Sequence, residues 1–165
     1  MSIILGIDPG LQKTGWGIIN SNGNRISFVA CGSANSDSHD PISTRLLSIS
    51  ESLRKIIEIY KPDQCAIEET FVNKNPMSSL KLGHARGAAM LTVSLAGLKP
   101  YEYAATLVKK TIVGVGRAEK AQVLMMVKQF LPKAEIKSED AADALAIAIC
   151  HVHHSHMHKI LEGVK

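Results

Sequence analysis

An unbroken apolar run that ends in a carboxylate constrains the fold of this chain more than any other feature. Residues 3–7 are aliphatic apart from Gly6, and Asp8 follows them directly, before a Pro-Gly turn. A run of this length bounded by turn residues predicts a strand buried on both faces, with an ionisable side chain at its end. A carboxylate in that place loses solvent, so it needs a cation, a metal ion or a cluster of donors nearby. A simple turn cap through the Asp8 side chain is the alternative.

The composition fits one globular domain without a membrane-spanning segment. The chain has 165 residues, 45% of them hydrophobic, which is enough for a sizeable core without disulfide staples. A formal charge of +4 tolerates a polyanionic partner without requiring one. Three widely spaced cysteines without a C-x-x-C pair argue against a disulfide framework and a zinc site, and indicate a reducing cytoplasm. We expect no leader and no membrane span, since the longest other apolar stretch, residues 87–98, is too short to cross a bilayer.

The first half of the chain predicts a mixed sheet. Short connections between the first three apolar segments indicate an antiparallel meander, with a hairpin turn at residues 21–24. A helical segment then separates the meander from a fourth strand, which is therefore a candidate parallel neighbour of the first. We expect strands over 3–8, 14–20, 25–33 and 64–69, and a helix from 42 to about 60.

The second half of the chain predicts mostly helices, and the whole order predicts an α/β domain with a mixed five-stranded sheet flanked by helices. The helix near residues 79–96 has a surface of small residues, which suits either internal packing or a homodimer contact. Ser138 is a candidate N-cap for the last helix. We expect a helix over about 79–96, a strand over 100–103, a helical turn over 105–110, a glycine loop over 113–117, a helix over 118–130 and a final helix from 139.

Further carboxylates are expected to converge on Asp8. Glu68 and Glu69 are equal candidates at the end of the fourth strand, and Asp140 and Asp143 share one face of the last helix. Asp140 alone is explained as a charge that offsets the helix dipole, but Asp143 lies among apolar residues. Like charges this close destabilise a fold, and two divalent cations would balance them. Oxygen ligands favour Mg²⁺ or Mn²⁺, and a metal pair suits phosphoryl displacement.

Basic residues suggest a nucleic-acid partner. One group surrounds the glycine loop, where backbone amides could hold a phosphate, although a solvated basic turn is the commoner explanation of such a cluster. A second group follows the fourth strand, where Phe71 could stack on a base or pack as a core residue. The two groups are Lys109, Lys110, Arg117 and Lys120, and then Lys74, Lys81 and Arg86.

Six motifs resemble one family, the RuvC-type Holliday junction resolvases. They run in order along the chain as GIDPG at 6–10, TGWG at 14–17, AIEE at 66–69, KLGHARG at 81–87, VGVG with AEK at 113–120, and DAADALA at 140–146. The resemblance implies a ribonuclease H-like fold in a homodimer. It also implies paired nicking of opposed strands at a four-way DNA junction, two Mg²⁺ or Mn²⁺ ions per site, a RuvA and RuvB partner complex and a bacterial cytoplasm.

The same resemblance assigns roles to individual residues. Asp8, Glu68, Asp140 and Asp143 match the metal-binding carboxylates of the family, which selects Glu68 over its neighbour. Lys109 and Lys120 match basic residues that act at the scissile phosphate, and Phe71 matches an aromatic that stacks near the junction centre. The expected products carry 5′-phosphate and 3′-hydroxyl ends.

The C-terminal segment lies beyond these motifs and is rich in histidine. We interpret residues 151–158 as a solvated, partly frayed helix end. An alternative is that His151, His154 and His158 share a helical face that binds a transition metal. We therefore expect a nuclease domain over residues 1–155 and a histidine-containing tail over 156–165.

Two other classes of function compete with a nuclease. The opening motif also resembles the phosphate loop of actin-like ATPases and sugar kinases, but those need a second lobe that a chain of 165 residues cannot supply. A junction-binding module without catalysis is the other alternative, and the presence of all four carboxylates argues against it.

Overall fold

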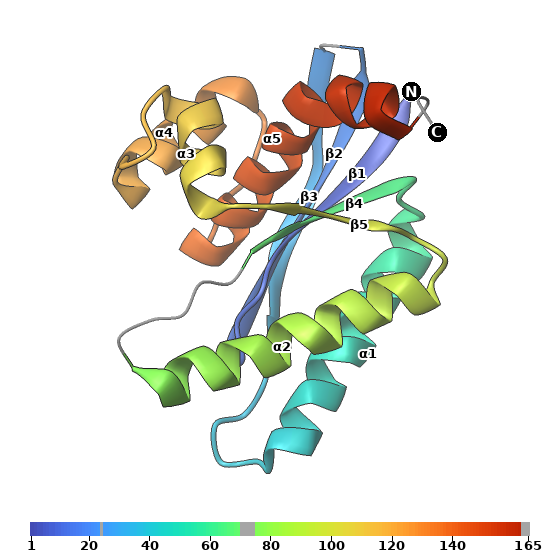
Figure 1. Cartoon of the computed structure of the whole chain (residues 1–165), viewed down its shortest axis with the longest axis vertical. Coiled ribbons are helices and arrows are strands. Elements are labelled where there is room, and N and C mark those ends of the chain that lie inside the picture. The colour runs from blue at the N-terminus through green and yellow to red at the C-terminus, as the bar shows by residue number, and fades with distance from the viewer. Residues whose placement is uncertain (24, 70–74, 163–165) are drawn as a thin grey trace.

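A five-stranded sheet between two layers of helices forms the molecule (Figure 1). The computed structural model describes residues 1–23, 25–69 and 75–162, with side chains up to residue 155. Helices α1 and α2 cover one face of the sheet, and α3, α4 and α5 cover the other. The elements are β1 (Ser2–Asp8), β2 (Lys13–Asn22), β3 (Arg25–Asn35), α1 (Ile42–Tyr60), β4 (Gln64–Glu68), α2 (Pro76–Leu95), β5 (Pro100–Tyr103), α3 (Ala105–Val113), α4 (Lys120–Phe130) and α5 (Glu139–Glu162).

The sheet has the order β3-β2-β1-β4-β5, so the strand that ends in Asp8 lies at its centre. β1 pairs antiparallel with β2 and parallel with β4, and β5 continues the parallel half. Both the antiparallel meander and the parallel fourth strand are thereby confirmed. Because β1 and β4 are parallel neighbours, their last residues, Asp8 and Glu68, meet at the same edge of the sheet.

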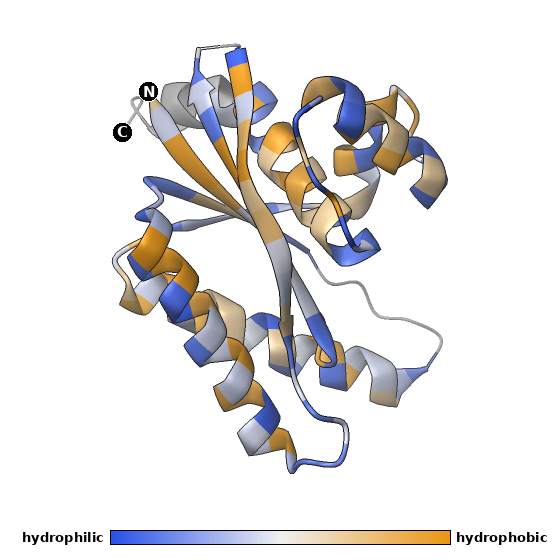
Figure 2. Cartoon of the chain, turned by 180° about the vertical axis from the view of Figure 1, so that it is seen from behind, coloured by the Kyte–Doolittle hydropathy of each residue, from blue (hydrophilic) through white to orange (hydrophobic). Residues whose placement is uncertain are grey.

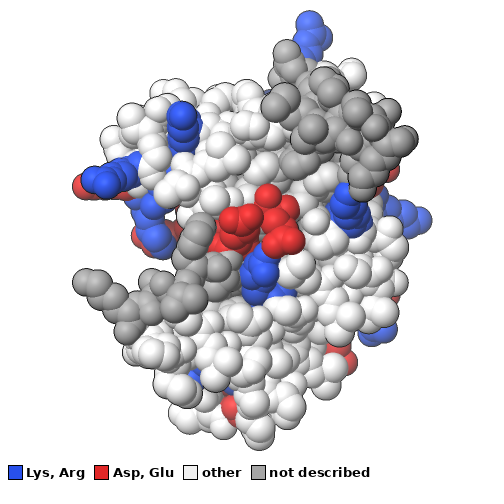
Figure 3. Space-filling model, in the orientation of Figure 1, with Lys and Arg blue, Asp and Glu red and all other residues white. Residues whose placement is uncertain are grey.

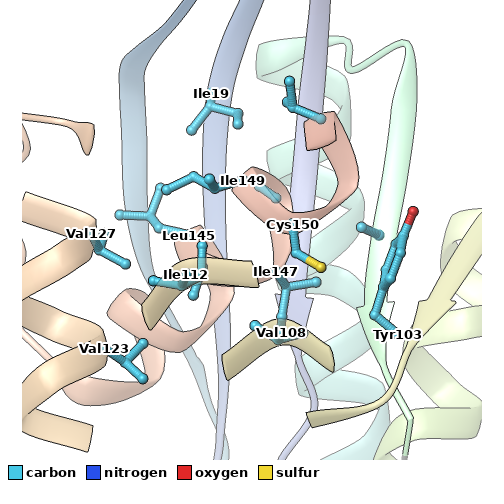
Figure 4. Packing of buried hydrophobic residues seen from close by; sticks show 14 of the residues in the cluster. Ile19, Tyr103, Val108, Ile112, Val123, Val127, Leu145, Ile147, Ile149 and Cys150 are labelled. Carbon is cyan, nitrogen blue, oxygen red and sulfur yellow. The ribbon is translucent and has the colours of Figure 1, made fainter. Parts of the chain in front are cut away.

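Two hydrophobic cores fix the helices to the sheet. In the first, Leu145 and Ile149 of α5 pack with Ile19 of β2, Ile112 of α3 and Val127 of α4 (Figure 4). The second core joins α1 and α2 to the opposite face of the sheet. Seen from behind, hydrophobic residues follow the strands and the helices beside them (Figure 2). The central strand β1 is therefore buried on both faces, as the apolar run before Asp8 predicts.

Helix α5 lies unusually close to β1 and β2, because glycines remove the side chains that would hold it away. A Cβ atom at Gly6 would collide with the carbonyl oxygen of Ala144, and one at Gly15 with that of Asp140. Gly17 in turn leaves space for the side chain of Leu145. The glycines of the first two sequence motifs thus bring α5, and the carboxylates that it carries, onto the strand that ends in Asp8.

Three helix boundaries differ from the sequence expectation, each for a local reason. α2 begins at Pro76 rather than near residue 79, because the Asn75 side chain caps it by accepting from the next turn. α3 is a nine-residue helix to Val113 rather than a turn over 105–110, and Gly114 ends it in the left-handed conformation. α4 begins at Lys120 rather than at 118, because Glu119 forms a capping box.

The last helix continues without a break to Glu162, so the expected boundary between residues 155 and 156 falls inside α5. Ser138 caps this helix as expected, since its hydroxyl accepts from the Ala141 amide at 3.2 Å. The division into a domain and a tail stays a prediction.

Among the described residues, no helix combines the length and the apolar character needed to cross a bilayer.

Candidate active site

Three of the four predicted carboxylates face one small cavity, which we call the carboxylate cavity. Its volume is about 230 Å³, and it opens where β1 and β4 end. Asp8, Glu68 and Asp143 line it together with the predicted lysines Lys109 and Lys120. The acidic side chains gather near the middle of one face of the molecule, with basic side chains beside them (Figure 3). Residues from two strands and three helices therefore meet in the carboxylate cavity.

The carboxylates of this cavity are held in an unfavourable environment. Burial, and next the negative charge of Glu68, raise the pKa of Asp8 to about 8. Burial and the charge of Asp143 raise the pKa of Glu68 to about 7. The pKa of Asp143 is also raised, again chiefly by burial. Desolvation and mutual repulsion both disfavour the ionised forms, so the cavity lacks positive charge.

Lys120 and Lys109 offset part of this negative charge. The Nζ atom of Lys120 lies 3.2 Å from Oε2 of Glu139 and 3.8 Å from Oδ2 of Asp143. Both lysines lower the pKa of Glu68 and of Asp143 through their charge. Two cations beside the carboxylates do not bring the pKa of Asp8 back to its ordinary range.

Asp140 stands at the margin of the carboxylate cavity rather than in its lining. Its backbone packs against Gly15, which is paired with Asp8 in the sheet. From there its charge still raises the pKa of both Asp8 and Asp143. The position of Asp140 thus links the first turn of α5 electrostatically to the end of β1.

The donor set of this site fits a hard divalent cation. Carboxylate oxygens are the ligands that Mg²⁺ and Mn²⁺ prefer, and a cation would relieve the repulsion that raises the pKa values. Among the described residues, no three His, Cys, Asp or Glu side chains are already close enough to form a ligand cluster.

The residues predicted to contact DNA lie in different parts of the structure. Lys81, Lys110 and Arg117 are exposed, on α2, at the end of α3 and between α3 and α4. Phe71 and Lys74 lie outside the described residues. For all five residues, contact with DNA stays a prediction.

Arg86 is engaged within the protein. Its Nε donates to the backbone carbonyl of Glu68 at 3.1 Å, and its guanidinium pairs with the carboxylate of Glu102. This guanidinium therefore supports the end of β4, next to the carboxylate cavity. A contact of Arg86 with DNA, which the sequence suggests, also stays a prediction.

The glycine loop offers fewer free donors than the sequence suggests. The Gly114 amide already donates to the carbonyl of Lys110, where it ends α3. The N-terminus of α4 is closed by the Glu119 side chain, which accepts a backbone hydrogen bond there. A carboxylate occupies the place at this helix end that a phosphate would need.

One buried polar residue differs from the sequence expectation. His151, which we expected at a solvated helix end, is only 1% exposed. Its Nδ1 lies 2.8 Å from the hydroxyl of Tyr103, and its Nε2 lies 2.8 Å from Oε1 of Gln64.

A larger cavity, of about 490 Å³, opens at the β3 edge beside Trp16, and none of the four predicted carboxylates lines it.

The fold and the site together define a class of protein. A mixed five-stranded sheet with this strand order and flanking helices is the ribonuclease H-like fold. Carboxylates at the ends of its two central strands and on the last helix, with lysines beside them, suit hydrolysis of a phosphodiester. The class is therefore that of ribonuclease H-like nucleases.

Comparison with known proteins identifies the family within this class. The family model described as crossover junction endodeoxyribonuclease RuvC matches residues 4–151. A protein of that name from Rhodopseudomonas palustris (strain BisB18) is 56% identical over 151 residues, covering 92% of this chain and 86% of the relative. One from Rhizobium etli is 51% identical over 161 residues, covering 98% and 95%. The chain belongs to the RuvC family of crossover junction endodeoxyribonucleases.

A solved structure agrees with this family. Thermus thermophilus RuvC, in complex with a Holliday junction substrate, matches with a TM-score of 0.88 at 28% identity, covering 96% of this chain and 97% of that one. Nucleases of the family depend on metal ions. The resemblance seen in the sequence motifs and the ribonuclease H-like fold that it implies are thereby confirmed.

Proposed function

We propose that this endonuclease resolves Holliday junctions in recombination and repair by paired, metal-dependent nicks of opposed strands. The observation that carries the proposal is the carboxylate cavity, in which three acidic side chains face each other with too little positive charge. A phosphodiester backbone would arrive there together with divalent cations. The complex of Thermus thermophilus RuvC with a Holliday junction substrate supports a four-way junction as the substrate.

Asp8, Glu68, Asp140 and Asp143 are proposed to hold two Mg²⁺ ions, with Mn²⁺ as a substitute. The raised pKa values of Asp8 and Glu68 support this, because proton and metal compete for the same oxygens. When bound, the ions supply Lewis acidity at the attacked phosphate and its leaving oxygen. The chain itself supplies a rigid platform, since Asp8 and Glu68 end paired strands.

Lys109 and Lys120 are proposed to act at the scissile phosphate. Both line the carboxylate cavity, one from α3 and the other from the first residue of α4. Without substrate, Lys120 pairs with Glu139 and Asp143, which keeps its ammonium beside the site. A phosphate that entered the cavity would compete for this ammonium, and the added charge would stabilise the transition state. The products would carry 5′-phosphate and 3′-hydroxyl ends.

A homodimer through α2 would place two such sites on one junction. Ala85 and Ala89 of this helix are buried within the protein, whereas Gly87 faces open space. Leu80 and Leu91, on the same exposed stripe, are 53% and 61% exposed. A second copy covering this stripe would remove apolar surface from water and permit close backbone approach.

Light scattering measures the mass of the Leu91→Glu variant in solution and thereby tests the dimer proposal. The variant should elute as a monomer, while Leu47→Glu, at an exposed position on α1, should keep the mass of the wild-type protein. Equal masses for both variants and the wild type would place the dimer contact elsewhere.

The family resemblance also supports an association with RuvA and RuvB and a place in the bacterial cytoplasm. The two relatives reported above are bacterial proteins, and both are named crossover junction endodeoxyribonuclease RuvC. We propose both, and co-purification of the full chain with each protein tests the first.

Cleavage of a synthetic four-way junction tests the function. With Mg²⁺, the wild type should introduce symmetric nicks in opposed strands and leave a linear duplex of the same sequence intact. Asp143→Asn should bind the junction but not cut it, because binding contacts are spread over many phosphates. Glu51→Gln, an exposed carboxylate on α1, is the matched control and should behave as the wild type. No nicking by the wild type, or full nicking by Asp143→Asn, would overturn the assignment.

A further inference from the structure

A buried polar bridge joins α5 to the β4–β5 side of the sheet. It consists of three side chains, Gln64 at the start of β4, Tyr103 at the end of β5 and His151 on α5, which we call the α5 clamp. Both ring nitrogens of His151 lie 2.8 Å from their partners, and the residue is only 1% exposed. The clamp therefore connects three elements that are distant in the sequence.

The clamp is built from neutral groups with defined directions. Because the amide oxygen of Gln64 accepts, Nε2 of His151 carries the proton and Nδ1 accepts from the hydroxyl of Tyr103. Burial raises the pKa of Tyr103, which keeps the phenol protonated as a donor. Buried hydrogen bonds of this kind are lost if the helix rotates or slides, and leaving a buried donor or acceptor without a partner is unfavourable.

Next to the carboxylates, the contact between α5 and the sheet is formed largely by backbone and small side chains. Gly6, Gly15 and Gly17 present backbone to the helix, and on its side Ala144 and Ala148 lie against Gly6. Leu145 inserts its side chain at Gly17, and this apolar contact carries no directional bond. Polar contacts such as the clamp add direction to apolar packing of this kind and thereby specify register.

The clamp is connected to both halves of the carboxylate site. His151 follows Asp140 by about three helical turns, so the two residues lie on the same side of α5, roughly 16 Å apart along its axis. Tyr103 pairs with Glu68 in the sheet, and its carbonyl accepts from the Glu69 amide at 2.9 Å. The clamp thus fixes the helix that carries two of the carboxylates to the strand pair that carries a third.

We propose that His151, through Gln64 and Tyr103, is a positioning residue that sets the rotation and register of α5, and thereby the place of Asp140 and Asp143 relative to Asp8 and Glu68. This inference rests on the proposed metal-dependent cleavage, which it deepens by naming a residue remote from the metal ligands. A small rotation at His151 shifts both carboxylates together. A misplacement of about 1 Å in a catalytic site can cost up to about a hundredfold in rate.

The test separates positioning from stability by removing the clamp in two ways. His151→Leu removes the hydrogen-bond partner that Gln64 and Tyr103 have in the clamp, so both stability and cleavage should fall. The triple variant Gln64→Leu, Tyr103→Phe, His151→Leu replaces all three with apolar side chains, so stability should largely return. Its cleavage rate should stay about tenfold or more below that of the wild type, because the directional contacts are still absent.

Three measurements on the full chain read the effect. They are the single-turnover cleavage rate at saturating Mg²⁺, the affinity for the junction with Ca²⁺ in place of Mg²⁺, and the affinity for Mn²⁺ without DNA by calorimetry. Junction affinity should be unchanged in the triple variant, and Mn²⁺ affinity should fall about tenfold. Ser155→Ala is the matched control, because its hydroxyl bonds only locally, to the Val152 carbonyl, in the bonds described.

A wild-type cleavage rate and Mn²⁺ affinity in the triple variant would overturn the proposal and reduce the clamp to a source of stability. Loss of Mn²⁺ affinity in that variant, with Ser155→Ala unchanged, supports it even if His151→Leu alone does not fold. Failure of the wild type to cut a junction overturns the proposed function instead. The Mn²⁺ measurement then still decides the role of the clamp, because it needs no substrate.

Discussion

Two positions along α5 bury polar side chains in opposite ways. Near the N-terminus of the helix, Asp143 shares a cavity with Asp8 and Glu68, and all three have raised pKa values. In the middle of the helix, His151 is more deeply buried, yet both of its ring nitrogens have partners. The first position therefore contains repelling charges, and the second contains neutral groups in satisfied hydrogen bonds.

This difference separates the requirements of catalysis from those of stability. Carboxylates that repel one another destabilise the metal-free fold, but they are what a divalent cation needs. The neutral contacts of His151 and the glycine contacts stabilise α5 without any ligand. The helix can then hold Asp140 and Asp143 at the site although the site itself opposes it.

The largest expected effect is the loss of cleavage in Asp8→Asn. This change keeps the shape of the side chain but removes one charged ligand at the centre of the cavity, so cleavage should fall at least about 100-fold. The metal-free variant should be more stable than the wild type near pH 8, because a repelling buried charge is gone. Junction cleavage and urea unfolding measure the two effects.

Glu51→Gln again serves as the matched carboxylate control for Asp8→Asn, and neither property should change in it. A fall in cleavage together with a fall in stability in Asp8→Asn would mean that Asp8 supports the fold rather than the chemistry, and the contrast between the carboxylates and His151 along α5 would disappear.

The next effect is a pH dependence of the metal-free stability. The pKa of Asp8 rises from 3.8 when unfolded to about 8 when folded, and that of Glu68 from 4.5 to about 7. A raised folded pKa contributes stability that is fully present below the unfolded value and is lost as the pH rises through the folded value. Between about pH 5 and pH 8 the free energy of unfolding should fall, by up to about 1.4 kcal/mol per pH unit for each extra proton bound by the folded state.

Urea unfolding in EDTA across this pH range measures the slope. Saturating Mg²⁺ should reduce it, and the stabilisation by Mg²⁺ should grow as the pH rises, because metal binding displaces protons. In metal-free Asp8→Asn the slope should be shallower. A metal-free wild type whose stability rises steadily from pH 5 to pH 8 would contradict the repulsion at this end of α5.

A smaller effect is expected for Lys120→Gln. Lys120 lowers the pKa of Asp8, Glu68 and Asp143 through its charge, so its removal should leave the carboxylates protonated at higher pH. Cleavage should fall about tenfold at neutral pH, and the rising limb of the pH–rate profile should move to higher pH. Lys128→Gln, an exposed lysine on the same helix, should leave the profile in place. Equal profiles for the two variants would remove Lys120 from the site.

Most of the fold could be predicted from local patterns. Apolar runs and short turns gave β1 to β3, and the crossover helix α1 gave the parallel position of β4, as observed. The errors lie at helix ends, where single side chains decide. Asn75 extends α2 backward, and Glu119 delays the start of α4.

The site could be predicted only in part. The end of a strand identified Asp8, but Glu68 and Glu69 were equal candidates until the family motif separated them. The burial of His151 could not be read from its surroundings, because it depends on partners 48 and 87 residues away in the sequence. A histidine among other histidines near a chain end gives no local sign of such contacts.

The smallest effect is expected for Glu102→Gln, which tests how the end of β4 is held. The variant weakens the ion pair with Arg86, but the bond from Arg86 Nε to the Glu68 carbonyl can remain. The Glu102 side chain is 43% exposed, and an exposed ion pair contributes about 1 kcal/mol or less. Stability should fall by no more than that amount, and cleavage should stay within about twofold. A tenfold loss of cleavage at unchanged stability would instead mean that Glu68, like the carboxylates of α5, depends on a remote contact for its position.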